Sequence, residues 1–188
     1  MDVTAPPAGL PTRYRLGRVA GRGGTATVWL ARDTRAGLDV VVKVLGAGAV
    51  PVARFEAEAR ALGRLSGVAG VVEVRAVGLT ADGRPWLVEE LVVGPTLADR
   101  LRRAPWAAGE VRALVHRLAT TLAAVHAAGV VHGDVAPANV LCRPDGSYLL
   151  CDFGVAAMSG CEEGRTPCTP SFAAPERRAG GAATAAAD

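Results

Sequence analysis

Three polar residues in the second half of the chain stand at spacings that could hold a divalent cation and orient a hydroxyl group. Asp134 and Asn139 lie within residues 132–139 (HGDVAPAN), and Asp152 begins the tripeptide at 152–154 (DFG). Carboxylate and amide oxygens are the ligands that Mg²⁺ prefers, and a carboxylate that binds no metal can accept a proton from a reacting hydroxyl. The pattern therefore predicts metal-assisted chemistry on a hydroxyl group, with ordinary turns as the alternative.

Lys43 is the basic residue most suited to bind a phosphate group as a compact positive charge. The chain has 21 Lys and Arg residues, and only Lys43 is a lysine. Arginine can replace lysine at most solvated positions but not where a compact point charge is needed. Lys43 lies in the apolar run 40–45, where an unpaired ammonium group is costly to bury, so it needs an anion. Glu58, in the helical segment that follows, can supply the carboxylate, whereas Glu56 is expected in solvent. The alternative is a lysine near a strand end that reaches water.

A glycine-rich segment, residues 21–28 (GRGGTATV), lies between two strand-like runs. Glycines let backbone N–H groups approach phosphate oxygens without a Cβ in the way. Ala26 stands where the third glycine of a G-x-G-x-x-G pattern would be, the segment lacks the G-K-[ST] ending of a Walker loop, and no long helix follows. These departures exclude a P-loop or dinucleotide fold. They leave a phosphate-covering hairpin, with a plain flexible hairpin as the alternative.

The elements that must position these residues change in character along the chain. β-Branched runs between Gly and Asp turns predict an antiparallel sheet with strands at 14–19, 25–31, 40–45, 71–79 and 86–92. Apolar residues at helical spacing predict helices at 51–65, 96–103 and 110–128, and two short strands follow at 139–142 and 148–151. The predicted fold class is therefore α+β, with a β-rich first part that contains one helix and a helical second part.

Composition limits the remaining possibilities. Half of the 188 residues are hydrophobic, so a core can form, and the net charge of +3 comes from scattered basic residues, which does not support nucleic-acid binding. No apolar run is suited to span a bilayer and the first residues have no secretory-signal pattern, so we expect no membrane segment and a cytoplasmic protein. The four cysteines, Cys142, Cys151, Cys161 and Cys168, lack metal-ligand spacing and are expected as reduced thiols.

Taken in order, these motifs resemble those of protein kinases, closest in style to the bacterial Ser/Thr kinases of eukaryotic type. The set consists of the glycine-rich hairpin, V-x-V-K ending at Lys43, the helix Glu58, H-x-D-x-x-x-x-N, D-F-G, and the A-P-E of residues 174–176. The resemblance implies a two-lobed kinase fold that uses ATP and Mg²⁺ and acts on a Ser or Thr hydroxyl of a protein substrate.

The resemblance also implies how the chain is divided. Residues 1–12 would be a Pro-rich tail, residues 13–93 the antiparallel N-lobe with its helix, and residues 94–188 a partial C-lobe with the catalytic loop and activation segment. Asp188 matches the start of the central C-lobe helix of the family, so the helical core of this lobe is expected to be incomplete.

Each candidate residue receives a role from the same resemblance. Asp134 would accept or orient the substrate hydroxyl, Lys43, held by Glu58, would contact the α- and β-phosphates, and Asn139 and Asp152 would hold Mg²⁺. A spine would be formed by Leu62, His132 and Phe153. The implied ATP-binding set, which covers the phosphates, sandwiches the adenine and forms the hinge, is Gly21, Arg22, Gly23, Gly24, Thr25, Ala26, Val28, Val41, Lys43, Glu90, Val92 and Leu141.

Three substitutions depart from the family pattern. Gly133 replaces the arginine before the catalytic Asp, which removes a cation that could clamp a phosphorylated activation loop. Ala136 replaces the lysine that Ser/Thr kinases place near the γ-phosphate, and loss of one such contact typically costs about 10² to 10³ in rate. Glu89 stands before the hinge, where an apolar gatekeeper is usual, and its carboxylate could compete for Lys43.

Three functions fit these residues. The first is a Ser/Thr protein kinase, with turnover reduced by the departures. The second is a pseudokinase or kinase fragment that binds nucleotide or a partner without turnover. The third is a small-molecule phosphotransferase of the aminoglycoside or choline kinase type, because His-Gly-Asp followed by Asn is that family's form of the catalytic loop. The glycine-rich hairpin, D-F-G and A-P-E favour protein kinases over the third class.

Overall fold

The computed structural model describes residues 7–22, 26–46, 52–153 and 169–188. They belong to two compact units, which we call the first and the second unit. The first unit comprises the described parts of Met1–Arg60 and Glu73–Leu91. The second comprises those of Ala61–Val72, Val92–Gly154 and Cys161–Asp188.

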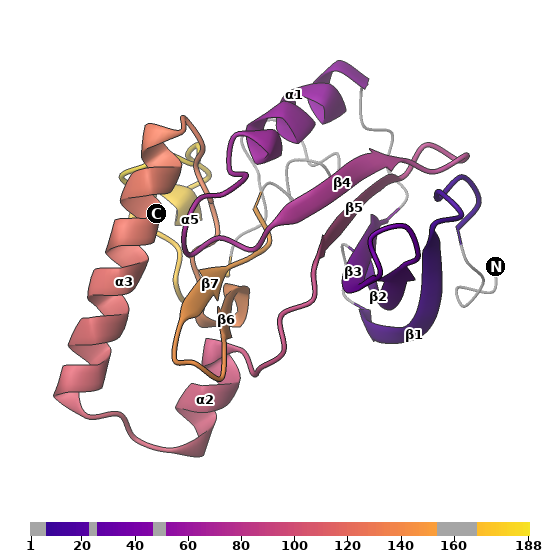
Figure 1. The fold of residues 1–188 in the computed structure, drawn as a ribbon. Helices are drawn as coiled ribbons and strands as arrows, with labels where there is room; N and C mark the ends of the chain where they lie inside the picture. Colours follow the sequence, from indigo (N-terminus) through magenta and orange to yellow (C-terminus); the bar gives the residue numbers. More distant parts are fainter. Residues whose placement is uncertain (1–6, 23–25, 47–51, 154–168) are drawn as a thin grey trace. The chain divides into compact units, whose positions relative to one another are not determined.

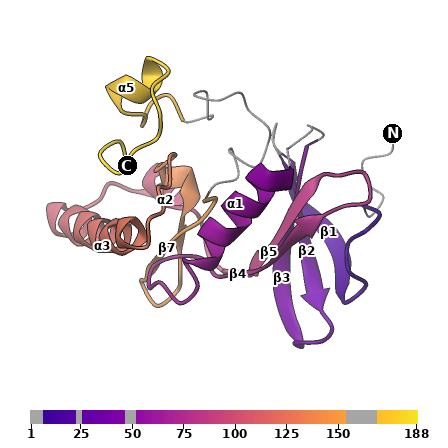
Figure 2. The ribbon, with the colours of Figure 1, turned by 90° about the horizontal axis from the view of Figure 1, so that it is seen from above.

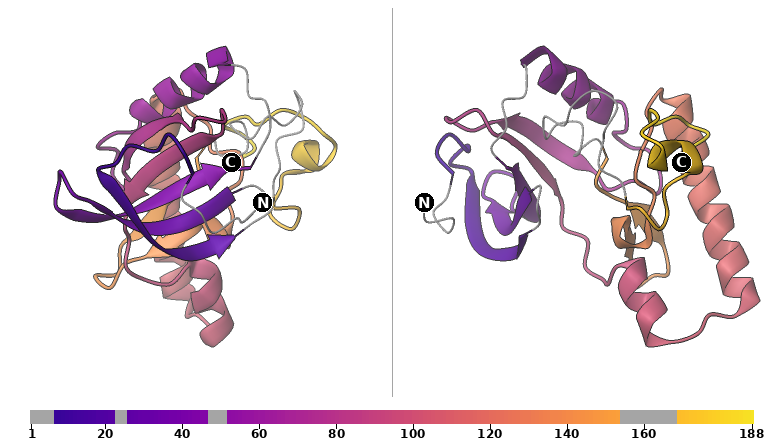
Figure 3. Two further views of the ribbon diagram at one scale, coloured as in Figure 1. Left: turned by 90° about the vertical axis from the view of Figure 1, so that its right-hand side faces the viewer. Right: turned by 180° about the vertical axis from the view of Figure 1, so that it is seen from behind.

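The first unit is built on a five-stranded antiparallel sheet with the order β1-β2-β3-β5-β4 (Figures 1 and 3). The first three strands follow one another as neighbours, and β5 lies between β3 and β4. The strands are β1 (Tyr14–Arg22), β2 (Ala26–Asp33), β3 (Leu38–Leu45), β4 (Val74–Leu79) and β5 (Pro85–Glu90). The ends of all five strands lie within three residues of the ends predicted from β-branched runs.

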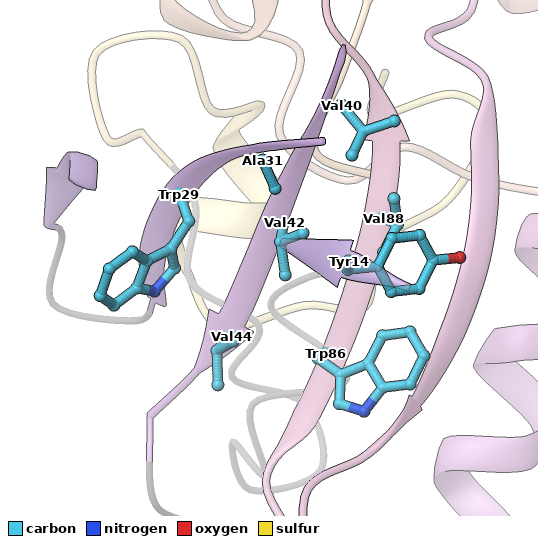
Figure 4. Packing of buried hydrophobic residues seen from close by; sticks show 8 residues of the cluster. All are labelled: Tyr14, Trp29, Ala31, Val40, Val42, Val44, Trp86 and Val88. Carbon is cyan, nitrogen blue, oxygen red and sulfur yellow. The ribbon is translucent and has the colours of Figure 1, made fainter. Parts of the chain in front are cut away.

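One face of this sheet forms the core of the first unit (Figure 4). Side chains alternate across a strand, so Val40, Val42 and Val44 of β3 share a face. They pack with residues of β1, β2 and β5, and the rings of Tyr14 and Trp86 meet edge to face with their centroids 6.2 Å apart. The cluster consists of Tyr14, Trp29, Ala31, Val40, Val42, Val44, Trp86 and Val88. The opposite face therefore carries the odd-numbered residues of β3, including Lys43.

A single helix, α1 (Val52–Gly63), interrupts the strands between β3 and β4, as predicted. Figures 1 and 2 show it as one straight helix, close to β4 in Figure 1. Phe55 and Leu62, seven residues apart, are 9 % and 4 % exposed, and Glu58 between them is half-buried. Residues seven apart lie on one side of an α-helix, so the apolar spacing seen in the sequence marks the buried side of α1.

The second unit contains helices and one short hairpin. α2 packs against η1 and β6, and α3 packs against β7. Thr96 caps α2 through a reciprocal pair of hydrogen bonds with Asp99, which fixes where that helix begins. The elements are α2 (Leu97–Arg103), α3 (Ala108–Ala127), the 3₁₀ turn η1 (Pro137–Asn139), β6 (Val140–Cys142), β7 (Tyr148–Leu150) and α5 (Pro175–Arg178). Among the described residues, no helix is both long and apolar enough to cross a membrane.

The strand predicted at 71–79 is wrong at its start, because β4 begins only at Val74. Val71 instead forms an isolated parallel bridge with Leu150, whose N–H donates to Gly70 O at 2.8 Å and whose C=O accepts from Val72 N at 2.9 Å. Val72 packs in a cluster with Leu149 and Cys151 of the second unit. The apolar run 71–79 therefore contributes to two sheets: its first residues pair with β7, and the residues from Val74 onward form β4. The pattern of residues within the run does not show where this change occurs.

Candidate active site

Asp134 and Asn139 are brought together by the loop that leads into β6. Asn139 Nδ2 donates to Asp134 Oδ2 at 3.0 Å and to the backbone oxygen of Asp134 at 2.8 Å. The 3₁₀ turn η1, which starts with Pro137, produces this return of the chain, and Asn139 N closes it on Ala136 O at 2.9 Å. Because its amide nitrogen faces Asp134, the amide oxygen of Asn139 is the atom that can ligate a metal.

Asp152 follows the other strand of the same hairpin. Val140 of β6 pairs with Leu150 of β7, and Cys151 N donates to Asn139 O at 3.0 Å, so Asn139 and Asp152 flank the same end of the hairpin. Asp152 has a φ of +68°, the left-handed region that residues other than Gly rarely adopt. Such backbone strain is often found at functional sites. One carboxylate and one amide oxygen suit Mg²⁺, which usually takes few protein ligands and keeps phosphate and water for the rest.

His132 connects the two sides of this site. Asp134 N donates to His132 Nδ1 at 3.2 Å, so the ring proton lies on Nε2, which donates to Cys151 O at 2.9 Å. Burial lowers the pKa of His132 below its ordinary value, so the ring is neutral. Its ring packs on Phe153 with centroids 4.4 Å apart. The stacking of His132 on Phe153 that the resemblance implies is thus present within the second unit.

Thr169, which the sequence analysis did not single out, contacts the predicted catalytic carboxylate. Its N–H donates to Asp134 Oδ1 at 2.7 Å, and its hydroxyl donates to Asp134 Oδ2 at 3.2 Å. The two residues are 35 positions apart in the chain. Both oxygens of Asp134 therefore accept hydrogen bonds, and any further hydroxyl group that approached this carboxylate would share or replace the contact with the Thr169 side chain. A Thr five residues before A-P-E is the only local signal for this role.

Asp188 was also missed as a positioning residue. Its side chain is 1 % exposed and accepts the backbone N–H groups of His132 and Gly133, both at 2.7 Å. His126 of α3 lies 3.0 Å away through its Nε2. Gly133 has a φ of +81°, which glycine adopts without strain and arginine does not. The replacement of arginine by Gly133 therefore suits the backbone conformation of this loop.

In the first unit, four predicted residues share the face of the sheet opposite its core. Val28 pairs with Lys43 across β2 and β3, and Val41 pairs with Glu89 across β3 and β5. Pairing partners in a sheet project on the same side, and alternation places Val41 and Lys43 together. The result is one surface that combines Val28, Val41, Lys43 and Glu89.

Lys43 forms a buried ion pair with Glu89. The sequence analysis named Glu58 as the carboxylate partner and Glu89 only as a possible competitor. Lys43 Nζ lies 2.7 Å from Glu89 Oε2, and the two side chains are 10 % and 7 % exposed. A contact between Glu89 and Lys43, which the sequence analysis considered, is therefore present in the structure. The pairing of Lys43 with Glu58 stays a prediction.

The remaining ATP-binding candidates are distributed over both units. Gly21 and Arg22 end β1 and Ala26 begins β2, whereas Gly23, Gly24 and Thr25 lie outside the described residues. Glu90 ends β5, where its N–H donates to Glu73 O at 3.0 Å and its Oε1 accepts from Glu73 N at 3.2 Å. Val92 and Leu141 belong to the second unit. Their assembly around one nucleotide stays a prediction.

Comparisons with known proteins identify the family of this chain. The family model described as protein kinase domain matches residues 14–188. The chain is 36 % identical over 191 residues to the serine/threonine-protein kinase PknA of Mycobacterium tuberculosis, covering 95 % of this chain and 44 % of PknA. It is 39 % identical over 178 residues to PknL of Mycobacterium bovis, covering 89 % of this chain and 44 % of PknL.

A third relative, the serine/threonine-protein kinase PknE of M. tuberculosis, is 37 % identical over 184 residues, covering 93 % of this chain and 32 % of PknE. The chain thus spans less than half the length of these curated relatives. The antiparallel sheet, its single helix and the catalytic-loop hairpin are those of a partial protein-kinase fold. This chain belongs to the protein kinase family.

Proposed function

We propose that this chain carries the nucleotide-binding and catalytic residues of a Ser/Thr protein kinase, which transfers the γ-phosphoryl group of ATP to a protein hydroxyl with the help of Mg²⁺. In this proposal residues 13–93 form the N-lobe and residues 94–188 form part of the C-lobe. The observation that carries the proposal is the arrangement in which Asn139 holds the carboxylate of Asp134 while the β6–β7 hairpin brings Asp152 beside Asn139.

In this proposal each of the candidate residues has a separate role in the reaction. Asp134 orients the substrate hydroxyl and takes its proton, while the hydroxyl oxygen forms a bond to the γ-phosphorus and the bond to the leaving ADP oxygen breaks. The Asn139 amide oxygen and the Asp152 carboxylate would hold Mg²⁺, which neutralises charge on the phosphates. Lys43 supplies a point charge to the α- and β-phosphates. His132 keeps Asp134 and Cys151 in fixed positions through its two ring nitrogens.

Nucleotide binding without turnover is the second candidate. Two observations favour it: Lys43 is held by Glu89 at 2.7 Å, and the position of the lysine near the γ-phosphate is occupied by Ala136, which is 2 % exposed. The names of the relatives favour a protein over a small molecule as the phosphoryl acceptor.

Paired binding and transfer assays test the proposal. The protein is titrated with ATP, with and without Mg²⁺, and phosphoryl transfer from labelled ATP to itself and to a generic Ser/Thr protein substrate is measured. We expect Asp134→Asn to retain ATP binding and lose about 10² to 10⁴ in transfer rate, the usual contribution of a general base. Asp152→Asn should lose the Mg²⁺-dependent part of ATP binding without loss of fold, because Asn also tolerates a positive φ.

Asp145→Asn is the matched control, since Asp145 is an exposed residue of the β6–β7 turn that bonds only its neighbour Ser147 among the contacts described. It should change neither measurement. Transfer at the parent rate by Asp134→Asn would contradict the proposal. A parent that binds ATP with Mg²⁺ but transfers nothing would establish the second candidate.

A further inference from the structure

The ion pair between Lys43 and Glu89 lies in the middle of the sheet rather than at its edge. Lys43 belongs to β3 and Glu89 to β5, and each of these strands has a neighbour on both sides. Lys43 pairs with Leu87 in the register and Glu89 pairs with Val41, so the two charged side chains are diagonal neighbours on one face. The diagonal positions are within reach of long side chains, as the 2.7 Å distance from Nζ to Oε2 shows.

The surroundings of this pair are apolar. Leu45, two residues from Lys43 on the same face, is 0 % exposed, and Leu87, opposite Lys43, is 1 % exposed. Charges in such a place have lost much of their hydration, so each strongly favours the partner that compensates it. Glu89 is therefore a strong ligand of the Lys43 ammonium group.

The same ammonium group is the one that the proposed kinase reaction requires at the α- and β-phosphates. A bound nucleotide and Glu89 present the same kind of oxygen ligand to Lys43. The ammonium group has three donors but a single positive charge, so a carboxylate 2.7 Å away takes up one donor and offsets much of the charge that the phosphates would otherwise meet. For Lys43 to reach the phosphates fully, its contact with Glu89 must weaken, and the carboxylate must then remain near the nucleotide.

We infer that Glu89 is an internal competitor of the nucleotide phosphates for Lys43, and that it sets the affinity of this chain for ATP. This inference rests on the proposed function, because it takes the phosphates to bind at Lys43. It has a signature that simple obstruction of the adenine pocket lacks. Competition for Lys43 weakens ligands that carry phosphates and leaves adenosine unaffected, whereas obstruction by the Glu89 side chain weakens ATP, ADP and adenosine alike.

Calorimetric titration of ATP, ADP and adenosine, each with Mg²⁺, tests the inference on the parent and on Glu89→Gln. Glutamine keeps the size of the side chain and an acceptor oxygen but removes the charge. In Glu89→Gln we expect ATP and ADP to bind about tenfold more tightly or better, which is the size of effect measured for close charge pairs. The affinity for adenosine should change less than about twofold. Glu89→Asp keeps the charge and shortens its reach by one methylene group, and it should shift ATP in the same direction by a smaller factor.

Glu56→Gln is the matched control. Glu56 lies on α1, its side chain is 58 % exposed, and it pairs only weakly with Arg60 at 3.6 Å. The variant removes the same charge from the same unit, so it measures the general gain in affinity of an anion for a less negative protein. That gain should be small, because solvent and salt screen an exposed charge.

Three outcomes would overturn the inference. Equal gains for adenosine and ATP in Glu89→Gln would show that the charge of Glu89 acts on the bound base and not through the phosphates. Unchanged ATP binding in Glu89→Gln and Glu89→Asp would show that Glu89 does not compete. No binding of ATP or adenosine to the parent or to any variant would overturn the proposed function itself, and this inference with it. Thermal unfolding of each variant verifies that it is folded, and Glu89→Asp answers the question if the amide variant does not fold.

Discussion

The carboxylate of Asp188 holds the backbone of Gly133, with a distance of 2.7 Å from Gly133 N to Asp188 Oδ1. The other carboxylate oxygen accepts His132 N at the same distance. Gly133 directly precedes Asp134, so the two hydrogen bonds define the backbone from which the predicted catalytic carboxylate projects. Because the acceptor is an ionised and buried carboxylate, these bonds belong to the stronger class of protein hydrogen bonds.

Replacement of Asp188 by Asn is expected to loosen this loop. The amide keeps one acceptor and turns an NH₂ group toward the other backbone donor, so one charge-assisted hydrogen bond is lost. We expect the free energy of unfolding to fall by about 1.5–3 kcal/mol. In a transfer assay kcat should fall more than ATP affinity, because in the proposed reaction Asp134 acts mainly in the transition state. His126→Gln, which keeps both backbone contacts, should show a smaller loss in both measurements.

Lys43→Met is expected to abolish phosphoryl transfer and also to destabilise the protein. The ion pair with Glu89 is buried, so methionine leaves the carboxylate without its cation, a change that typically costs about 3–5 kcal/mol. Chemical denaturation measures this loss. The double variant Lys43→Met/Glu89→Leu removes both charges and should recover most of the stability while transfer stays absent. A single variant as stable as the parent would contradict the energetic importance of the pair.

Stability should depend on pH through His132. Burial lowers its pKa in the folded protein below the ordinary value of 6.5, so below that pH the unfolded chain binds more protons than the folded one. The stability that comes from the lowered pKa of His132 is fully present above pH 6.5. It is lost as the pH falls, and the free energy of unfolding then decreases by up to about 1.4 kcal/mol per pH unit for one proton. The free energy of unfolding is measured between pH 7.5 and 5.5, about one unit either side of the ordinary pKa, and its dependence on pH should be weaker in His132→Gln. His116→Gln, at an exposed position of α3, should keep the parent's slope.

Ala136→Lys should raise kcat more than ATP affinity if a lysine at this position reaches the γ-phosphate. The gain could be as large as about 10² to 10³, the value of one contact made in the transition state. Ala136 is only 2 % exposed, so the longer side chain should also lower the melting temperature. Ala138→Lys adds the same charge at an exposed position two residues away and should change neither property. Single-turnover transfer and thermal unfolding separate the two effects.

The sequence predicts those parts of the structure that depend on local pattern. Apolar and β-branched runs between turns predict β3 and β5. The position of Lys43 in an apolar strand correctly predicts that it pairs with an anion. The main anion described for it is Glu89, which is close only because β5 pairs with β3, whereas Glu58 is close in sequence. Pairing between distant strands thus brings Glu89 to Lys43, which local spacing in the sequence does not show, and the pairing of Lys43 with Glu58 stays a prediction.

The contacts that the sequence analysis missed are all long-range. Asp188 reaches Gly133 across 55 positions and Thr169 reaches Asp134 across 35, and each stands in a segment without a periodic pattern. The apolar face predicted for α3 is present but only partly covered in the part of the chain that the structure describes. Leu114 and Val125 are buried, whereas Val111 and Val115 are 42 % and 59 % exposed. Periodicity shows that a face is apolar but not what covers it.

The bridge between Val71 and Leu150 limits which fragments of this protein can be produced separately without exposing a strand edge. Leu150 pairs with Val140 on one side and with residues 70–72 on the other, although residues 70–72 directly precede β4 of the first unit. A fragment that began at Gly94 would therefore expose the backbone of β7 as a strand edge, which other chains can pair with and which promotes aggregation. Segment 61–72 must accompany residues 92–188 when the second unit is produced separately.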